Sequence, residues 1–182
     1  AGVSPDTMQA RARVRKPWLS LVTNHRKWVL LNWPTPGQAQ KARMRYAEFC
    51  DFILDTSCVD YAEMGRRMAP LCALMAKTDA VRRPVVPCAG ENNIPDGEVF
   101  TAPIRDSAEG TLTYNTPSPY HGRVYNKVRL EFSRGRVVRA SAEQDSDALN
   151  AIFDTDGGGA HVGEFALGVN PRITRAFCNT LF

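Results

Sequence analysis

The sequence predicts an α+β fold in which a helical α/β part is followed by a β-rich part. Apolar residues recur at spacings of three and four over residues 37–77, as the buried stripe of a helix requires. The short apolar run from Lys27 to Trp33 is typical of a buried strand in an α/β layer. After residue 110 the pattern changes to short runs rich in β-branched residues, which indicate strands.

A domain boundary is expected where the helical pattern ends. Around residues 79–90 the sequence becomes rich in Pro, Gly and β-branched residues. We therefore expect residues 1–82 to form a portion of an α/β N-terminal domain. Residues 83–182 then form the first part of a β-rich domain.

Two elements are expected at the start of the chain. Residues 4–16 combine a helix start with a run of helix formers, and they predict a helix that Pro17 ends. The strand expected over residues 27–33 follows it. Thr35 and Pro36 then mark the start of the next helix.

Two further helices are predicted in the first part. One runs from residue 37 to about residue 56, and the other runs from Asp60 to Lys77. Asp60 is the expected N-cap of the latter, and Glu63 stands at the position of a capping box. Its methionine stripe is expected to fill the core and not to bind a ligand.

The second part is predicted to contain strands and one helix. Ser133-Arg134-Gly135 has the form of a hairpin turn, with Gly near the left-handed position. The expected strands cover residues 111–114, 123–132 and 135–140, and the expected helix covers residues 145–153.

Composition restricts the class of protein. The chain of 182 residues is 43% hydrophobic and 23% charged, which is near the average of folded soluble domains. It has no apolar signal region at its start and no window of about 18 uncharged apolar residues, so we expect no membrane partner. Its five cysteines are scattered and contain no C-x-x-C pair, which favours reduced thiols in a cytoplasmic protein.

The net charge of +4 comes largely from a basic stretch between Arg11 and Arg45. Basic stripes can bind nucleic acid, but these charges alternate with Ala and Val along a helical run. A solvated helix face is the better interpretation, and we expect no nucleic-acid partner. The sequence also has no Gly-x-Ser-x-Gly elbow, phosphate-binding loop or Rossmann glycine set, so serine-hydrolase and nucleotide chemistries lose support.

Glu98 is the first candidate site residue. Pro95-Asp96-Gly97 places Pro and Gly where a tight turn prefers them, so Glu98 is expected at the start of the following strand. A carboxylate fixed there by the scaffold is suited to bind a metal or to act as a base. The alternative is a plain hairpin in which Glu98 faces solvent, and spacing alone favours that alternative.

Glu164 is the second candidate site residue. It lies in an apolar run flanked by Gly163 and Gly168, where an unpaired charge is costly. This setting argues for a cation, a metal or a proton as its partner. His161 precedes it by three residues, but glycines disfavour a helix, and residues three apart in a strand face opposite sides. We expect His161 to be a surface or loop residue, as we do for His25 and His121.

These two motifs resemble those of the M29 aminopeptidases, also called the thermophilic metalloprotease family. Segments 93–103 (NIPDGEVFTAP) and 163–171 (GEFALGVNP) are similar to the family's own in sequence, order and separation. In that family one glutamate from each motif binds a pair of divalent metal ions. The resemblance assigns these places to Glu98 and Glu164, with Glu164 as the bridging ligand.

The resemblance implies a metal-dependent aminopeptidase in which Glu98 and Glu164 are catalytic residues as well as metal ligands. The implied cofactors are two divalent metal ions, which are zinc, cobalt, manganese or magnesium. Such a pair can bind the free amine of a peptide, polarise its first carbonyl group and lower the pKa of a bound water molecule. The implied partners are a peptide substrate and a second copy of the chain in a homodimer. Residues 83–182 would begin the catalytic domain.

We also expect the chain to be truncated relative to the family. The family's remaining ligands follow a Leu-Phe-Asp-Glu-Lys segment, and this chain ends at Leu181-Phe182 within it. Two carboxylates without histidine partners should bind metal weakly and with poor selectivity. The alternative function is therefore a non-catalytic interaction fragment that pairs with a full-length homologue.

Overall fold

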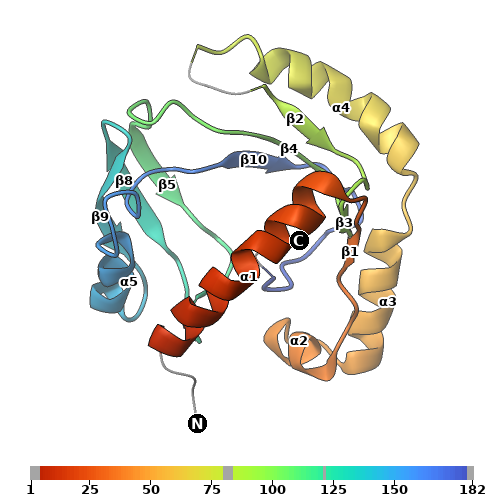
Figure 1. Ribbon diagram of the computed structural model, residues 1–182, viewed down its shortest axis with the longest axis horizontal. Helices are drawn as coiled ribbons and strands as arrows, with labels where there is room; N and C mark the ends of the chain where they lie inside the picture. The colour runs from red at the N-terminus through yellow and green to blue at the C-terminus, as the bar shows by residue number, and fades with distance from the viewer. Residues whose placement is uncertain (1–4, 80–83, 121, 180–182) are drawn as a thin grey trace.

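The computed structural model describes residues 5–79, 84–120 and 122–179. Helices and small sheets both contribute to it, which confirms the predicted α+β class. Figure 1 shows α3 and α4 along one side of the molecule, α1 across the front, and the sheets between them and α5. The predicted domain boundary between residues 82 and 83 lies outside the described residues.

Helix α1 (Pro5–His25) is longer than predicted, because it continues through Pro17. The predicted end at Pro17 is therefore wrong. An end is expected there because a proline inside a helix lacks the N–H of one helical hydrogen bond and costs about 3 kcal/mol. The second half of α1 presents several large apolar side chains to solvent, and Trp18 among them is 71% exposed.

Strand β1 (Leu30–Leu31) pairs in parallel with β3 (Asn93–Ile94). Both leucines of β1 are exposed, so the expected burial of this strand is wrong. Parallel strands are normally covered on both faces. Here β1 and β3 form a sheet of only two strands within the described part of the chain, which leaves the leucines uncovered.

Helices α2 (Pro36–Lys41) and α3 (Tyr46–Ser57) replace the single helix predicted over residues 37–56. The predicted start is confirmed, because Thr35 forms a reciprocal capping box with Gln38. The break falls at Arg43, which has a φ of 55°. No Gly or Pro marks that position, so the residue types gave no sign of the break.

Helix α4 (Tyr61–Met75) begins after the predicted N-cap, and the Asp60 carboxylate accepts a hydrogen bond from the Glu63 N–H at 2.8 Å. The reciprocal half of the expected capping box is not formed, since the Glu63 carboxylate binds Arg66 and Arg67 instead. The methionine stripe faces the core as predicted: Met64, Met68 and Met75 are buried with Val99.

The β-rich part contains a second core beside helix α5. Leu149 of that helix packs with Leu130 and Ala140 of the neighbouring sheet. The predicted hairpin turn is confirmed, with φ values of 47° at Arg134 and 74° at Gly135. The predicted strand 123–132 is in fact two strands, separated at Lys127 with a φ of 51°. The elements are β5 (Gly110–Thr113), β6 (Ser118–Tyr120), β7 (Arg123–Tyr125), β8 (Arg129–Ser133), β9 (Arg136–Ser141) and α5 (Ser146–Phe153).

A third sheet joins the two motifs that carry the candidate residues. Its order is β10-β4-β2, and both pairings are antiparallel. Strand β4 (Glu98–Thr101) lies in the middle, between β2 (Val86–Cys88) and β10 (Phe165–Gly168). Helix α4 packs against one face of this sheet through Val99, which is fully buried.

Candidate metal centre

The turn before Glu98 has the predicted form. Gly97 has a φ of 129°, and Glu98 is the first residue of β4. A Cβ atom at Gly97 would lie 2.6 Å from the Cβ of Asn170, so only glycine fits there. The Asp96 carboxylate accepts hydrogen bonds from the N–H groups of Gly90 at 2.7 Å and Gly97 at 2.8 Å. These contacts fix the backbone that presents Glu98.

Glu98 lies on the sheet face opposite α4. Successive side chains of a strand point to opposite faces, and Val99 faces α4. The cross-strand partners of Glu98 are Cys88 on β2 and Gly168 on β10. A Cβ atom built at Gly168 would meet no atom within 4 Å, so there is open space beside the Glu98 carboxylate. Glu98 is half-buried, and its strand β4 pairs with β10 and β2. The alternative of a plain hairpin in which Glu98 faces solvent is therefore wrong.

Glu164 immediately precedes β10 and lies four positions before Gly168, the partner of Glu98. Glu164 itself lies outside the strand, next to the end of β10 that pairs with Thr101, and its charge contributes to the raised pKa of Glu98. Glu164 is exposed, as are the four residues of β10. The expectation that Glu164 is buried in an apolar run is thus wrong, because this face of β10 is open to solvent.

The carboxylates around Glu98 repel one another and shift the pKa values of nearby groups. The pKa of Glu98 is raised, first by burial and then by the charges of Glu164 and Asp96. Burial and the nearby carboxylates also raise the pKa of the Cys88 thiol to about 12, so it is protonated at neutral pH. A divalent cation beside Glu98 would relieve this repulsion between carboxylates.

The described residues provide only part of a coordination sphere. Nowhere among them do three or more His, Cys, Asp or Glu side chains converge as a metal would need. His161 pairs in an isolated bridge with Arg136, and its Nε2 lies 3.4 Å from the Arg136 guanidinium. His25 ends α1 and is exposed, and His121 lies outside the described residues. The donor set that remains is carboxylate oxygen, which suits hard divalent cations such as magnesium and manganese.

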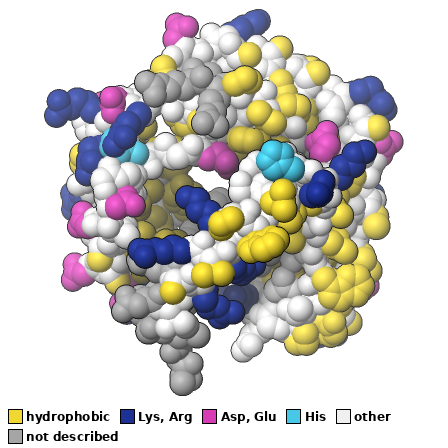
Figure 2. Space-filling model, viewed as in Figure 1, with side chains coloured by type: hydrophobic (Ala, Val, Ile, Leu, Met, Phe, Trp, Pro, Cys, Tyr) yellow, Lys and Arg dark blue, Asp and Glu magenta, His cyan; other side chains and the backbone are white. Residues whose placement is uncertain are grey.

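Figure 2 shows that the molecule is hollowed near the middle of the face that α1 crosses, with acidic, basic and hydrophobic side chains around the hollow. All five cysteines are free thiols. In the part of the chain that the structure describes, no helix is both long and apolar enough to cross a membrane.

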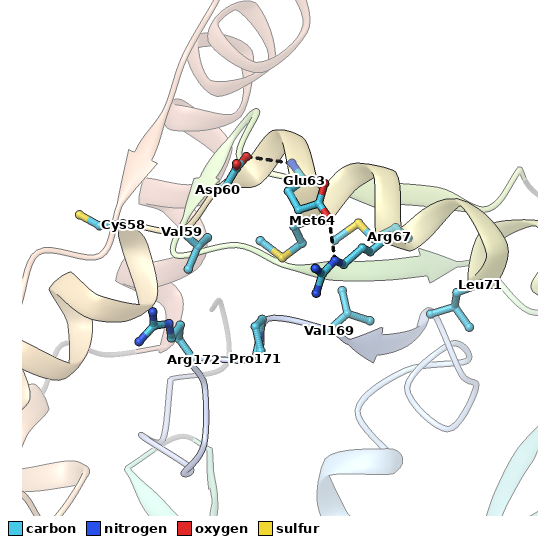
Figure 3. Close-up of a pocket in the computed structure, with 11 residues that line it drawn as sticks. Cys58, Val59, Asp60, Glu63, Met64, Arg67, Leu71, Val169, Pro171 and Arg172 are labelled. Carbon is cyan, nitrogen blue, oxygen red and sulfur yellow. Dashed lines mark hydrogen bonds and ion pairs between the residues drawn. The ribbon is translucent and has the colours of Figure 1, made fainter.

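A separate cavity of about 380 Å³ lies on the α4 side of the sheet. Figure 3 shows its apolar wall and the guanidinium group of Arg67, which is held by Glu63. Arg172 at its rim is likewise paired, with Asp55. Neither candidate glutamate lines this cavity, so it is not part of the candidate metal centre. Its apolar lining consists of Val59, Met64, Met68, Leu71, Val169 and Pro171.

Comparison with known proteins identifies the family. The model of the thermophilic metalloprotease family (M29) matches residues 86–182, which include both candidate glutamates. The chain belongs to the M29 family. Aminopeptidase 2 of Geobacillus stearothermophilus is 44% identical over 75 residues, which cover 41% of this chain and 18% of that protein. Aminopeptidase AmpS of Bacillus subtilis is 36% identical over 94 residues, which cover 50% of this chain and 23% of that protein.

The fold is similar to that of a solved structure. Wild-type AmpT from Thermus thermophilus superimposes with a TM-score of 0.77 over 99% of this chain and 56% of that chain, at 24% identity. In sequence, the matched segments span about a fifth of the length of these two curated aminopeptidases, 18% and 23%. In structure, the chain spans 56% of the AmpT chain.

Sequence reasoning did not place three residues beside Glu98 or the turn that precedes it. Gly168 and Asn170 lie inside the second motif, but their roles depend on the register between β10 and β4, which a single sequence does not specify. Cys88 gave no signal at all, since it stands in none of the motifs. Only the pairing of β2 with β4 brings it beside Glu98.

Proposed function

We propose that this M29 chain carries part of a two-metal aminopeptidase centre, with Glu98 and Glu164 as metal ligands. The observations that carry this proposal are that Glu98 begins β4 and Glu164 adjoins β10, the antiparallel partner of β4, and that the charge of Glu164 contributes to the raised pKa of Glu98. The open space at Gly168 leaves room for a ligand. A cation would relieve the repulsion from Glu164 and Asp96, which after burial contributes to the raised pKa of Glu98.

Each glutamate has a distinct role in this proposal. Glu98 is half-buried and held by the Asp96–Gly97 turn, so it is the fixed ligand. Glu164 is exposed and adjoins the open face of β10, where it is available as the bridging ligand. A bound pair of divalent ions would supply the Lewis acidity for hydrolysis of the N-terminal residue of a peptide. The candidate ions are zinc, cobalt, manganese and magnesium.

A homodimer in the cytoplasm completes the proposal. The free cysteines fit a reducing compartment. The exposed apolar residues of α1 and β1 are available for contact with a second copy.

Metal titration tests the proposal on the chain itself. Free Mn²⁺ is measured by electron paramagnetic resonance in wild type, Glu98→Gln, Glu164→Gln and the control Glu143→Gln. Glu143 is the control because it pairs with Lys127, away from the β4–β10 sheet. The first two substitutions should each weaken Mn²⁺ binding by about tenfold or more, because losing even an outer-shell partner of a metal ligand typically costs about 10–100-fold in affinity. Unchanged binding in both Glu98→Gln and Glu164→Gln would exclude these carboxylates as ligands.

The second candidate function is a non-catalytic fragment that pairs with a full-length M29 relative. The exposure of Trp18, Leu30 and Leu31 favours it, since monomers rarely expose such apolar groups together. Mixing the chain with a full-length M29 aminopeptidase and following sedimentation tests this function. A new species that contains both chains supports it, and independent sedimentation of the two excludes it.

A further inference from the structure

The side chain of Asn170 is buried just beyond β10, with 7% of its surface exposed. Its amide group donates hydrogen bonds to two main-chain carbonyls, those of Thr56 at 3.0 Å and Asp96 at 2.8 Å. Its Oδ1 accepts a third from the Arg172 N–H at 3.0 Å. Both donors of the amide are therefore used, as a buried amide requires.

These bonds join three segments that are far apart in the sequence. Thr56 lies near the end of α3, and Asp96 lies in the turn before β4. Asn170 stands two residues beyond Gly168, the cross-strand partner of Glu98, and Asp96 stands two residues before Glu98. The Asn170 side chain thus connects the end of the β4–β10 pair that contains Glu98 to the preceding turn and to α3.

Packing at the turn depends on the same residue. The Val169 N–H donates to the Gly97 carbonyl at 2.8 Å, which continues the β10–β4 pairing up to Asn170. Gly97 approaches the Asn170 Cβ so closely that no other residue fits. A shift of the Asn170 side chain would consequently move the Asp96–Gly97 peptide and the start of β4. It would also leave the buried Thr56 carbonyl without its donor.

We infer that Asn170 is a positioning residue for the candidate metal centre, and that it sets where the Glu98 carboxylate lies relative to β10. The role of Glu98 as ligand rests on the proposed function. The bracing of the turn by Asn170 rests only on the hydrogen bonds of this chain.

A matched pair of variants tests the inference. Asn170→Asp keeps the shape and the acceptor of the side chain but removes both N–H donors. Asn150→Asp is the control, because Asn150 makes an equivalent set of bonds elsewhere. It donates to the carbonyls of Ala140 and Ser146 at 2.9 and 2.7 Å and accepts from the Ala140 N–H at 3.3 Å. If Asn170→Asp does not fold, Asn170→Ser replaces it in the test. The serine variant also lacks the two amide donors, but it places no carboxylate against the two carbonyls.

Two quantities are measured on the full chain: the rate of amide hydrogen exchange at Val169 and the affinity for Mn²⁺. Asn170→Asp should speed exchange at Val169 and weaken Mn²⁺ binding, each by about tenfold, as expected for the loss of bonds of this kind. Asn150→Asp should change either quantity by less than about twofold, although it loses the same number of donors. Melting temperatures show whether the two variants are comparably destabilised.

The outcomes separate this inference from the proposed function. Unchanged exchange at Val169 in Asn170→Asp overturns the inference. Equal Mn²⁺ affinity in Asn170→Asp and wild type, when Glu98→Gln weakens binding as predicted, also overturns it. If Glu98→Gln itself leaves Mn²⁺ binding unchanged, the proposed metal site fails. The exchange at Val169 then still decides whether Asn170 braces the turn.

Discussion

Gly168 lies directly opposite Glu98 across the β4–β10 pair, and a side chain at Gly168 would enter open space. A strand glycine normally weakens a sheet, because it contributes no side-chain packing. The space that it leaves here adjoins the half-buried carboxylate of the candidate centre. A side chain at Gly168 should therefore affect metal binding at Glu98 without affecting the stability of the sheet.

The substitution Gly168→Val should therefore leave the fold intact and damage the site. Valine suits a strand, so the melting temperature should stay the same or rise by no more than about 4 °C. Mn²⁺ affinity should fall by about tenfold, because the new side chain occupies the space beside Glu98. Leu167→Val is the control, since Leu167 points to the other face of β10. Full Mn²⁺ binding by a well-folded Gly168→Val would show that this space is not used by the metal.

Ionisation of Glu98 should destabilise the metal-free chain. Its folded-state pKa is raised, by burial first and by the Glu164 and Asp96 charges second, so the folded chain binds this proton more tightly than the unfolded chain does. The penalty is absent below the ordinary pKa of a glutamate, grows as pH rises through the folded-state pKa and is complete above it.

Glu98→Gln should accordingly melt at the same temperature as wild type at low pH and higher than wild type at neutral pH. We expect a rise of no more than about 2 °C, because solvent screens a half-buried group. Glu164→Gln should give a smaller rise, since it removes a repelling charge but leaves Glu98 buried. Melting curves from pH 4 to 8 with a chelator test this. A lower melting temperature of Glu98→Gln at neutral pH would contradict it.

The 182-residue chain alone should have no measurable aminopeptidase activity. Two carboxylates cannot fix metal, water and substrate together, and the described residues offer no third donor beside them. The assay uses Leu-p-nitroanilide with zinc, cobalt, manganese or magnesium. Turnover that survives repurification and disappears in Glu98→Gln would show that the prediction is wrong.

Local signals predicted the turn and the caps around the candidate site, but not its surroundings. Pro95, Gly97 and Asp60 act within a few residues, so their effects can be inferred from the sequence and are present in the structure. The break at Arg43 is also local, since the N–H groups of Arg43 and Met44 bond back to the carbonyls of Gln40 and Ala39, but no Gly marks it. The exposure of Glu164 depends on how distant segments pack. The same holds for Asn170, which bonds to a residue 114 positions away. A single sequence does not specify such contacts.

Phe49 should contribute strongly to stability. It is fully buried in the core between α2, α3 and Phe177, so Phe49→Ala should cost about 3–5 kcal/mol in the free energy of unfolding. Leu54 lies on the same helix but is 50% exposed, and Leu54→Ala should cost less than about 1 kcal/mol. Urea unfolding of both variants tests this contrast. Equal losses would show that the core does not depend on Phe49.

The chain should self-associate through α1 and β1. Val29, Leu30, Leu31 and Trp33 are all exposed, as is Trp18 on α1. Strand β1 pairs only with β3 among the described strands, so one edge of it is open to a further strand. Open apolar edges recruit other chains, and natural proteins protect them with charges. The sedimentation coefficient of the wild type should therefore rise with concentration.

Placing a charge on that edge should weaken the association. Leu31→Lys should raise the dissociation constant by about tenfold, because a desolvated ammonium group opposes pairing at the edge. Leu74→Lys is the matched control, since Leu74 is similarly exposed but lies on α4, away from β1. Sedimentation velocity over a hundredfold range of concentration measures both. A wild type that remains monomeric throughout, or an equal loss in both variants, would show that β1 is not the contact.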